Sequence, residues 1–376
     1  MMATLNRFFN TIAALLGVAI LSSQTLFASP LSLFNHFDKN SPYTLSIEYN
    51  NANDAIALKD TLKYNWYKGY SPREGSNIAI INHRIELGTA FSEWYLGYAL
   101  RYDMFIDTNK EATDILQLIN TKSDLPLDRV YKVDIEAYGI ATHNLIASRR
   151  FNLNAQWSLY VGGAILYAFG TQDGFVDAYA NIVSKKEYDF EGYSQYYYDK
   201  NHLYELDVER PNAYGYSLKF GLEYHSNNHR FQLLVEDFAS YIFWKDLPYS
   251  EISITSNTKE YDENGYIKYN PTISGYELSK EYTQKLHTKV LAQYEYQLNP
   301  NLTTQLALGY YNDYLLPFAA IEYQHNEKLN YALGYEGRFH QLSFAFEYEN
   351  LKASIKTNNI QNPTALSFNL NYSFSL

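Results

Sequence analysis

The C-terminal stretch LSFNLNYSFSL, residues 366–376, alternates strictly between apolar and small polar side chains. Successive side chains of a β-strand point to opposite faces, so one face of this segment is wholly apolar and the other is wholly polar. A soluble β-sandwich would produce the same alternation, with its apolar face on a core. A membrane barrel produces it with the apolar face towards lipid, and each spanning strand then needs about 9–11 residues.

The same period of two recurs along most of the chain, in segments separated alternately by tight turns and by longer connections. Fourteen such segments can be counted from residue 43 onward. In bacterial barrels the short turns lie in the periplasm and the long loops lie outside the cell. We therefore predict an all-β fold, a closed antiparallel transmembrane β-barrel of about 14 strands with long extracellular loops. Twelve or sixteen strands are the alternatives, because 251–273 could hold another hairpin.

The predicted extracellular connections differ in composition. The four longest are 51–76, 107–128, 170–212 and 246–279. Residues 111–119 (EATDILQLI) place Ile115, Leu118 and Ile119 on one side of a short helix, which either folds into the mouth of the barrel or caps its rim. Residues 185–210 and 246–281 are acidic and rich in tyrosine. They form either a solvated cap or a surface that binds divalent cations or recognises solutes.

The N-terminus carries an export signal. Arg7 is followed by the apolar run 11–22 and by Leu26-Phe27-Ala28, which is a plausible cleavage site. A membrane-spanning helix needs about 20 apolar residues, so this run is too short to serve as an anchor. We predict a signal peptide over 1–28, a short periplasmic segment over 29–41 and a barrel over 42–376.

Composition excludes several classes of protein. The chain has 376 residues, a formal net charge of -11, no cysteine, 46% hydrophobic residues and 17% aromatic residues. The apolar content is too high for disorder. The absence of cysteine excludes disulfide scaffolds and zinc–thiolate sites. The acidic balance argues against nucleic acid as a partner.

The strand face opposite the apolar one is expected to line the lumen. A charge on the lipid face would cost roughly 2–4 kcal/mol near the midplane, so charged residues belong on the inner face. The predicted lining residues are Glu48, Arg84, Glu86, Arg101, Asp103, Asp134, Glu136, Lys219, Glu223, Glu236, Lys285, His287, Lys289, Glu295, Glu322, Glu336, Glu347, Lys352 and Lys356. They form either an aqueous path or a ladder of ion pairs that closes a narrow barrel. Arg84 and Glu86 beside Arg101 and Asp103 could form a constriction or a structural network.

The export signal, the alternating strands and the C-terminal Leu370-x-Tyr372-x-Phe374-x-Leu376 resemble those of Gram-negative outer-membrane β-barrel proteins. The resemblance implies that the barrel assembly machinery reads the last strand, which usually ends in Phe in that class. Fourteen strands with long third and fourth outer loops are similar to the FadL-like transporter family. Members of that family carry an N-terminal hatch with an Asn-Pro-Ala motif, whereas only about 13 residues separate the predicted cleavage site from the first strand here, and no such motif occurs.

We expect a porin-like channel in the outer membrane that lets small solutes diffuse through a charged lumen. One alternative is FadL-like uptake of a hydrophobic molecule, and another is a non-conducting structural or accessory barrel. Enzyme activity is not expected, because the chain has no His-x-Ser pair on one strand, no HExxH and no P-loop. No cofactor or metal is implied. The expected partners are outer-membrane lipids and lipopolysaccharide, the barrel assembly machinery and an unknown small solute, but not nucleic acid.

Overall fold

The computed structural model describes residues 43–61, 70–200, 211–261, 267–269 and 272–375. The predicted signal peptide (1–28) and periplasmic segment (29–41) lie outside the described residues. The strands are β1 (Tyr43–Asn53), β2 (Ser76–Phe91), β3 (Trp94–Asn109), β4 (Val130–Asn152), β5 (Trp157–Ser184), β6 (Glu187–Tyr198), β7 (Ala213–Ser226), β8 (His229–Glu236), β9 (Tyr241–Thr255), β10 (Lys259–Tyr261), β11 (Ile267–Tyr269), β12 (Ile273–Lys285), β13 (Lys289–Asn299), β14 (Leu302–Tyr311), β15 (Tyr314–Asn326), β16 (Leu329–Glu336), β17 (Gln341–Tyr348), β18 (Leu351–Thr357) and β19 (Ala365–Phe374). The helices of these ranges are α3 (Leu58–Thr61) and α4 (Lys110–Thr121), and neither is long and apolar enough to cross a membrane.

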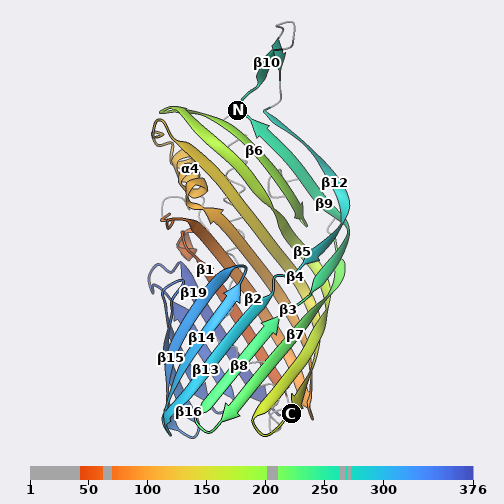
Figure 1. Cartoon of the computed structure of the whole chain (residues 1–376), viewed down its shortest axis with the longest axis vertical. Coiled ribbons are helices and arrows are strands. Elements are labelled where there is room, and N and C mark those ends of the chain that lie inside the picture. Colours follow the sequence, from red (N-terminus) through yellow and green to blue (C-terminus); the bar gives the residue numbers. More distant parts are fainter. Residues whose placement is uncertain (1–42, 62–69, 201–210, 262–266, 270–271, 376) are drawn as a thin grey trace.

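The first and last strands close the sheet into a barrel (Figure 1). β1 and β19 pair antiparallel from Tyr43↔Phe374 to Ala52↔Ala365. β2 lies beside β1 and pairs with it at Asn53↔Ala79. Each further pairing between neighbours in the ring is antiparallel as well. The prediction of an all-β, closed antiparallel barrel is confirmed.

The main sheet holds 17 strands and not about 14 as predicted, although the closed ring within it runs through 14, because β6, β9 and β12 lie outside that ring. Two of the additional strands arise from interruptions. β7 pairs with both β8 and β9, which are separated by the break at 237–240, where Asp237 and Ala239 have positive φ angles. On the other side, β12 pairs with β9 and β13 pairs with β8. The break between β12 and β13 lies at residues 286–288. The third additional strand is β6, which has no counterpart in the prediction.

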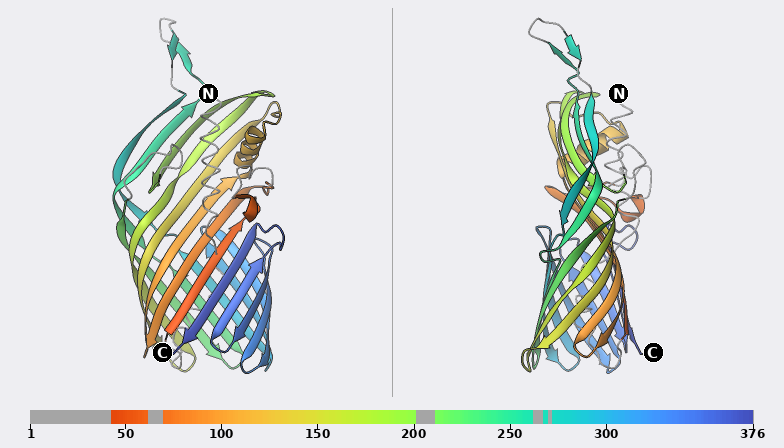
Figure 2. Two further views of the ribbon diagram at one scale, coloured as in Figure 1. Left: turned by 180° about the vertical axis from the view of Figure 1, so that it is seen from behind. Right: turned by 90° about the vertical axis from the view of Figure 1, so that its right-hand side faces the viewer.

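Two segments that were predicted to be loops are largely strand. β5 pairs with β7 over residues 157–168 and with β6 beyond residue 172, so it continues far past the barrel rim. β6 pairs in turn with β9, and β9 pairs with β12. These upper strand segments form a wall that rises above one side of the barrel, which we call the upper wall (Figure 2). The prediction of loops over 170–212 and 246–279 is therefore wrong for the parts that belong to β5, β6, β9 and β12, which form a sheet extension.

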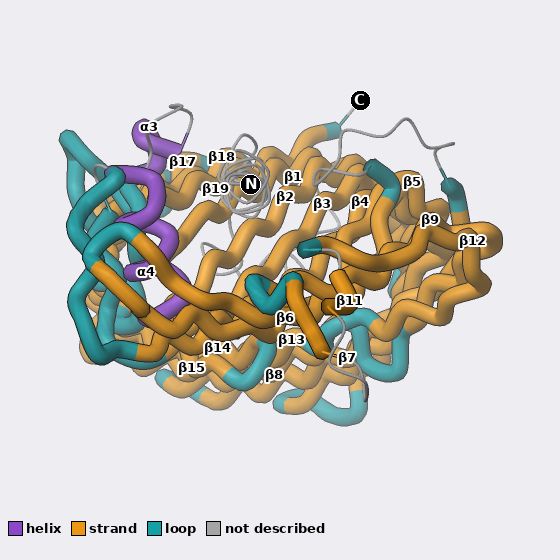
Figure 3. Tube along the Cα trace, turned by 90° about the horizontal axis from the view of Figure 1, so that it is seen from above, coloured by secondary structure: helices purple, strands orange, loops and turns teal. Residues whose placement is uncertain are grey.

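Helix α4 confirms the helix predicted within 107–128. The side chain of its N-cap residue, Asn109, accepts a hydrogen bond from Ala112 N at 3.0 Å, and Lys122 ends the helix with a left-handed φ of 54°. Ile115 and Leu116 are fully buried against residues of β2, β3 and β4 such as Ile81, which point away from the lumen. The helix therefore packs on the outside of the upper strands and does not enter the mouth (Figure 3).

The outward face of the barrel is apolar all round. Leu145 and Ile165, together with Leu306 and Leu333 on later strands, are 60–66% exposed. Exposure of so large an apolar area to water would be unfavourable, whereas contact of the same side chains with the hydrocarbon of a membrane is favourable. Tyrosines such as Tyr214 and Tyr294 are exposed on the same face, as suits a headgroup region. This surface is that of a transmembrane barrel.

A charge introduced into this band tests its contact with lipid. We expect Leu333→Arg to lower the free energy of unfolding by roughly 2–4 kcal/mol, because the guanidinium would have to leave water for hydrocarbon. The measurement is urea unfolding of the barrel in lipid vesicles. Leu127→Arg is the control, because Leu127 is 53% exposed beyond α4 and away from the band. A change within about 0.5 kcal/mol is expected there. Equal costs at the two positions would contradict a lipid-facing band.

Candidate functional site

The centre of the lumen holds a buried set of charges around Arg101 of β3. The Arg101 guanidinium donates to Asp103 at 2.8 Å and to Asp237 at 3.0 Å. Lys289 of β13 donates to Asp103 at 2.8 Å. Arg101 is 3% exposed and Asp237 is fully buried. Ser217 Oγ adds a hydrogen bond to Asp237 at 2.8 Å, so both carboxylates are well satisfied.

A second group of charges lies against the first. Arg84 of β2 binds Glu86 at 2.7 Å and Glu236 of β8 at 2.6 Å. Lys219 of β7 binds Glu236 at 3.3 Å. Tyr95 Oη donates to Glu86 at 2.6 Å. We call the whole set the ion-pair layer; its members are Arg84, Glu86, Arg101, Asp103, Lys219, Glu236, Asp237 and Lys289.

The ion-pair layer joins opposite walls of the barrel. β2 and β3 are separated from β8 by β4, β5 and β7 along the ring of paired strands. The Arg84–Glu236, Arg101–Asp237 and Lys289–Asp103 bridges therefore cross the lumen instead of running along one wall. Its four cations and four anions balance, which is the condition under which charges can be held away from water. The layer therefore places ion pairs across the lumen at this level.

Apolar and aromatic side chains fill the lumen on the outer side of the ion-pair layer. Phe105 meets Tyr311 edge-on with ring centroids 5.6 Å apart. Tyr138 and His287 stack with centroids 3.9 Å apart, again from different walls. We call this set the aromatic layer; its members are Ile78, Ile80, Phe105, Tyr138, Ile140, Leu166, Trp244, Leu286, His287, Tyr311, Leu316 and Phe339. A solute that arrives from outside would meet this layer before the ion-pair layer.

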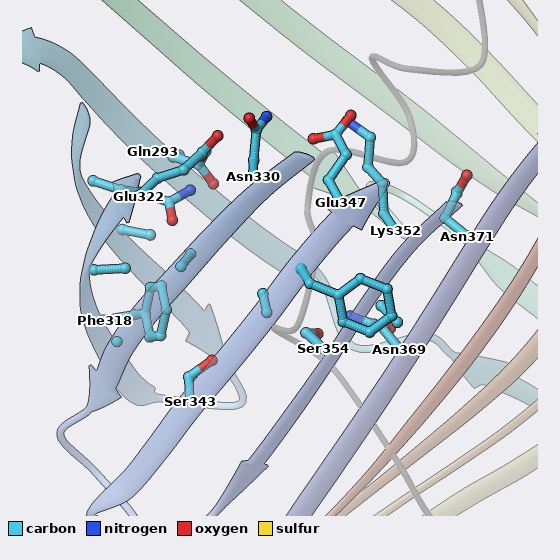
Figure 4. A pocket seen from close by; sticks show the side chains of 18 of the residues that line it. Gln293, Phe318, Glu322, Asn330, Ser343, Glu347, Lys352, Ser354, Asn369 and Asn371 are labelled. Atoms are coloured by element: carbon cyan, nitrogen blue, oxygen red, sulfur yellow. The ribbon is translucent and has the colours of Figure 1, made fainter. Parts of the chain in front are cut away.

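A cavity of mixed lining extends from Leu316 towards the short turns, and we call it the polar cavity for the carboxylates and amides that face it. It has a volume of about 120 Å³ and is lined by β1 and by β13 to β19 (Figure 4). Glu322 and Phe318 of β15 face it, and Glu347 forms an ion pair with Lys352 at 2.9 Å on its edge. On the neighbouring wall, Arg230 binds Glu223 at 2.7 Å and Glu295 at 3.7 Å.

The remaining predicted lining residues lie elsewhere. Glu336 accepts hydrogen bonds from the backbone N–H groups of Arg338 and Phe339, so it shapes a turn. Lys356 lies over the Phe318 ring at 4.8 Å. Asp134 and Glu136 lie on the lumen side of β4 but above the barrel, and Asp134 pairs there with Lys132. The prediction is wrong for Lys285, which is exposed and points outward because the interruption at 286–288 reverses the alternation between β12 and β13.

Asp237 and Arg230 are functional candidates that the sequence analysis missed. Asp237 interrupts an alternating strand, and a charged residue at such a break is a signal that could have been read. Its positive φ of 60° turns the carboxylate into the lumen, against Arg101. Arg230 lies next to a tight turn, where the alternation of apolar and polar residues does not predict which way a side chain points.

The acidic, tyrosine-rich segments meet on the upper wall. Tyr276 and Tyr249 donate to Glu251 at 2.5 Å and 2.8 Å. These hydrogen bonds lower the pKa of Glu251 below its ordinary value. Across the described ranges, no group of three or more His, Asp or Glu residues lies close enough together to hold a metal ion.

The lowered pKa predicts an acid-sensitive upper wall. A carboxyl group whose folded pKa is depressed stabilises the fold above its unfolded pKa, and this contribution is lost as the pH falls through the folded value. Amide hydrogen exchange in β9 and β12 should therefore become faster, relative to the rest of the barrel, as the pH is lowered from 7 towards 3. In Glu251→Gln this additional acceleration should be absent. An unchanged pH response in that variant would show that Glu251 is not the group responsible.

Comparison with known proteins gives similarity at the level of the barrel. No family model and no curated protein matches the chain. Among solved structures, the toluene transporter TodX of P. putida covers 93% of this chain with 93% of its own, at 8% identity and a TM-score of 0.46. A TodX deltaS2S3 mutant, described as a monoaromatic hydrocarbon channel, has 11% sequence identity and a TM-score of 0.46, and the match covers 93% of this chain and 94% of the mutant. A FadL homologue of Pseudomonas aeruginosa has 9% sequence identity and a TM-score of 0.43, and the match covers 94% of this chain and 96% of the homologue.

Proposed function

We propose that this chain is an outer-membrane transporter for small apolar molecules and not an open diffusion pore. The observation that carries the proposal is the order of the two layers in the lumen. The aromatic layer lies towards the outside of the cell. The ion-pair layer lies beneath it, and we infer that its cross-lumen ion pairs close the lumen there. A hydrated ion gains nothing from the first layer and is stopped by the second.

An apolar solute gains free energy on entering the aromatic layer. Removal of apolar surface from water is worth about 25 cal/mol per Å², and aromatic rings add favourable edge and stacking contacts. Trp244 lies in this layer, 2% exposed, with its indole N–H held by Gln284 Oε1 at 3.0 Å. Onward passage requires the pairs of the ion-pair layer to separate. Transport is therefore selective and slow compared with diffusion through a porin.

The test combines conductance with fluorescence quenching. The refolded mature chain should give no ohmic steps in a planar bilayer. Bromobenzene, a heavy-atom quencher, should quench its tryptophan emission with a saturable component that is lost in Trp244→Phe. Trp94 and Trp157 point outward and report only non-saturable partitioning into the membrane, so they serve as an internal control, and Trp66, which lies outside the described residues, is replaced by Phe in both proteins.

Each outcome separates the candidate functions. Ohmic steps from the unmodified barrel would overturn the proposal in favour of an open porin. Electrical silence without saturable quenching would favour a non-conducting structural barrel, a reading that the complete charge balance of the ion-pair layer also supports. Silence together with Trp244-dependent saturation would support a transporter for apolar molecules.

A further inference from the structure

The polar cavity near the short turns has a chemistry unlike that of the aromatic layer. Its lining combines carboxylates, amides and hydroxyls with an apolar floor of Phe318, Ala332 and Ala345 (Figure 4). Glu48 of β1 and Glu322 of β15 face it from different walls. Neither carboxylate has an ion-pair partner within 4.0 Å among the residues that the structure describes. Glu347 is paired with Lys352, and Lys356 lies over the ring of the lining residue Phe318, so Glu48 and Glu322 face one further cation and leave the cavity with a net negative charge.

Buried amide groups in the cavity are also incompletely satisfied. Gln293 is 2% exposed, and its Nε2 donates to Glu295 at 2.7 Å, which fixes its Oε1 as an acceptor. Gln293 Oε1, Asn330 Oδ1 and Asn371 Nδ2 have no hydrogen-bond partner within the described part of the chain. Asn371 is 8% exposed. Buried polar atoms without partners are costly, so each one points to a missing partner.

We propose that this cavity binds a small organic cation of the primary-amine class. An ammonium group carries three donors and a positive charge, and so it matches the carboxylates and the free amide oxygens of Gln293 and Asn330, whereas the donor Asn371 Nδ2 is not matched by it. A short carbon chain would lie on Phe318 and the neighbouring alanines, where a bare metal ion would gain nothing. Glu48 and Glu322 are half-buried carboxylates without an ion-pair partner, and an ammonium group supplies the cation that such a carboxylate attracts.

The size of the cavity limits the ligand. A volume of about 120 Å³ accommodates a molecule of a few heavy atoms, comparable to the benzene-sized ligands that engineered cavities of about 150 Å³ accept. A four-carbon diamine is a suitable probe of this class, because it carries two ammonium groups on a short carbon chain. Leu316 lines the cavity and belongs to the aromatic layer as well, but Glu48 and Glu322 are not members of that layer and Trp244 does not line the cavity.

Calorimetric titration of the refolded mature chain in micelles tests the proposal, with three probes of similar size. Putrescine should bind saturably at one site. Butane-1,4-diol should bind at least roughly tenfold more weakly, because it lacks the charge, and succinate should not bind. Glu322→Gln should weaken putrescine binding by roughly tenfold or more, because it removes the charge but keeps the shape. Glu136→Gln is the matched control, because Glu136 lies above the barrel, and it should leave binding unchanged.

A second variant guards against misfolding. Ala345→Phe should fill the cavity without changing any charge, and it should abolish putrescine binding while the barrel keeps its heat-modifiable migration on gels. The absence of saturable putrescine binding, or equal binding in folded Glu322→Gln, would overturn the proposal and leave a water-filled cavity. Quenching of Trp244 by bromobenzene should be the same in both variants, so the failure of this site and the failure of the proposed transport function are distinguishable.

Discussion

Replacement of Arg101 by alanine is expected to turn an electrically silent barrel into a conducting one. The Arg101 side chain bridges Asp103 and Asp237 and so joins opposite walls of the lumen. Without it the ion-pair layer holds three cations and four anions, its carboxylates repel one another, and water fills the vacated space. Planar-bilayer recordings in a KCl gradient should show ohmic steps. Their reversal potential should indicate cation preference, because the layer is then net negative.

The same substitution should be costly for stability. Removal of one partner from a buried charge pair leaves the others uncompensated and typically lowers the free energy of unfolding by about 3–5 kcal/mol. Arg149→Ala is the control, because Arg149 lies over the outward-facing rings of Trp94 and Phe151 at 5.2 Å and 4.8 Å. That variant should stay silent. The double variant Arg101→Met with Asp237→Asn restores charge balance and most of the volume, so it should conduct less than Arg101→Ala. A folded Arg101→Ala barrel that remains silent would place the barrier elsewhere in the lumen.

The alternation of side chains could predict the barrel because it is a local property with a fixed period. Once residues 366–376 are placed with their apolar face outward, every regular strand has its orientation set. The sequence could not predict how far strands continue beyond the membrane. β6 and the upper part of β9 pair with each other across more than 50 residues of chain, and their tyrosine-rich, acidic composition is typical of a loop.

The candidate site shows the same division between local and distant information. The period of two placed Arg84, Arg101 and Glu236 on the inner face, where the structure has them. Whether these charges line a path or close it depends on the distance between opposite walls, which no local pattern contains. The error at Lys285 has a related cause, since three residues without strand pairing are enough to reverse the alternation. The cavity amides Gln293 and Asn371 are likewise visible only once the walls are assembled.

Closure of the lumen and stability of the wall are linked through Tyr95. Gly88 of β2 is paired with Gly97 of β3, and the buried Tyr95 ring lies against both glycines on the lumen side. This position lets Tyr95 Oη reach Glu86 at 2.6 Å, and Glu86 in turn holds Arg84. The absence of a side chain at position 88 is therefore a condition for the second half of the ion-pair layer.

Gly88→Ala is accordingly expected to be severely destabilising for so small a change. A Cβ at this position would overlap the Tyr95 ring and hydroxyl. The ring is 1% exposed and cannot move aside without breaking its bond to Glu86. Overpacking costs about 1–3 kcal/mol, and a buried acceptor that loses its donor costs about 1–3 kcal/mol more. Urea unfolding in lipid vesicles should therefore show a loss of about 2–6 kcal/mol.

Gly139→Ala provides a control in the same barrel. The nearest atoms to a Cβ at Gly139 are Met104 Cε at 3.4 Å and Asp103 O at 3.6 Å, which is ordinary packing. Its effect should lie within about 1 kcal/mol of zero. Combining Gly88→Ala with Tyr95→Leu should recover part of the loss, because the overlap disappears with the ring, and the double-mutant cycle should show favourable coupling of about 1 kcal/mol or more. Additive effects of the two substitutions would mean that the position of the Tyr95 ring does not depend on Gly88.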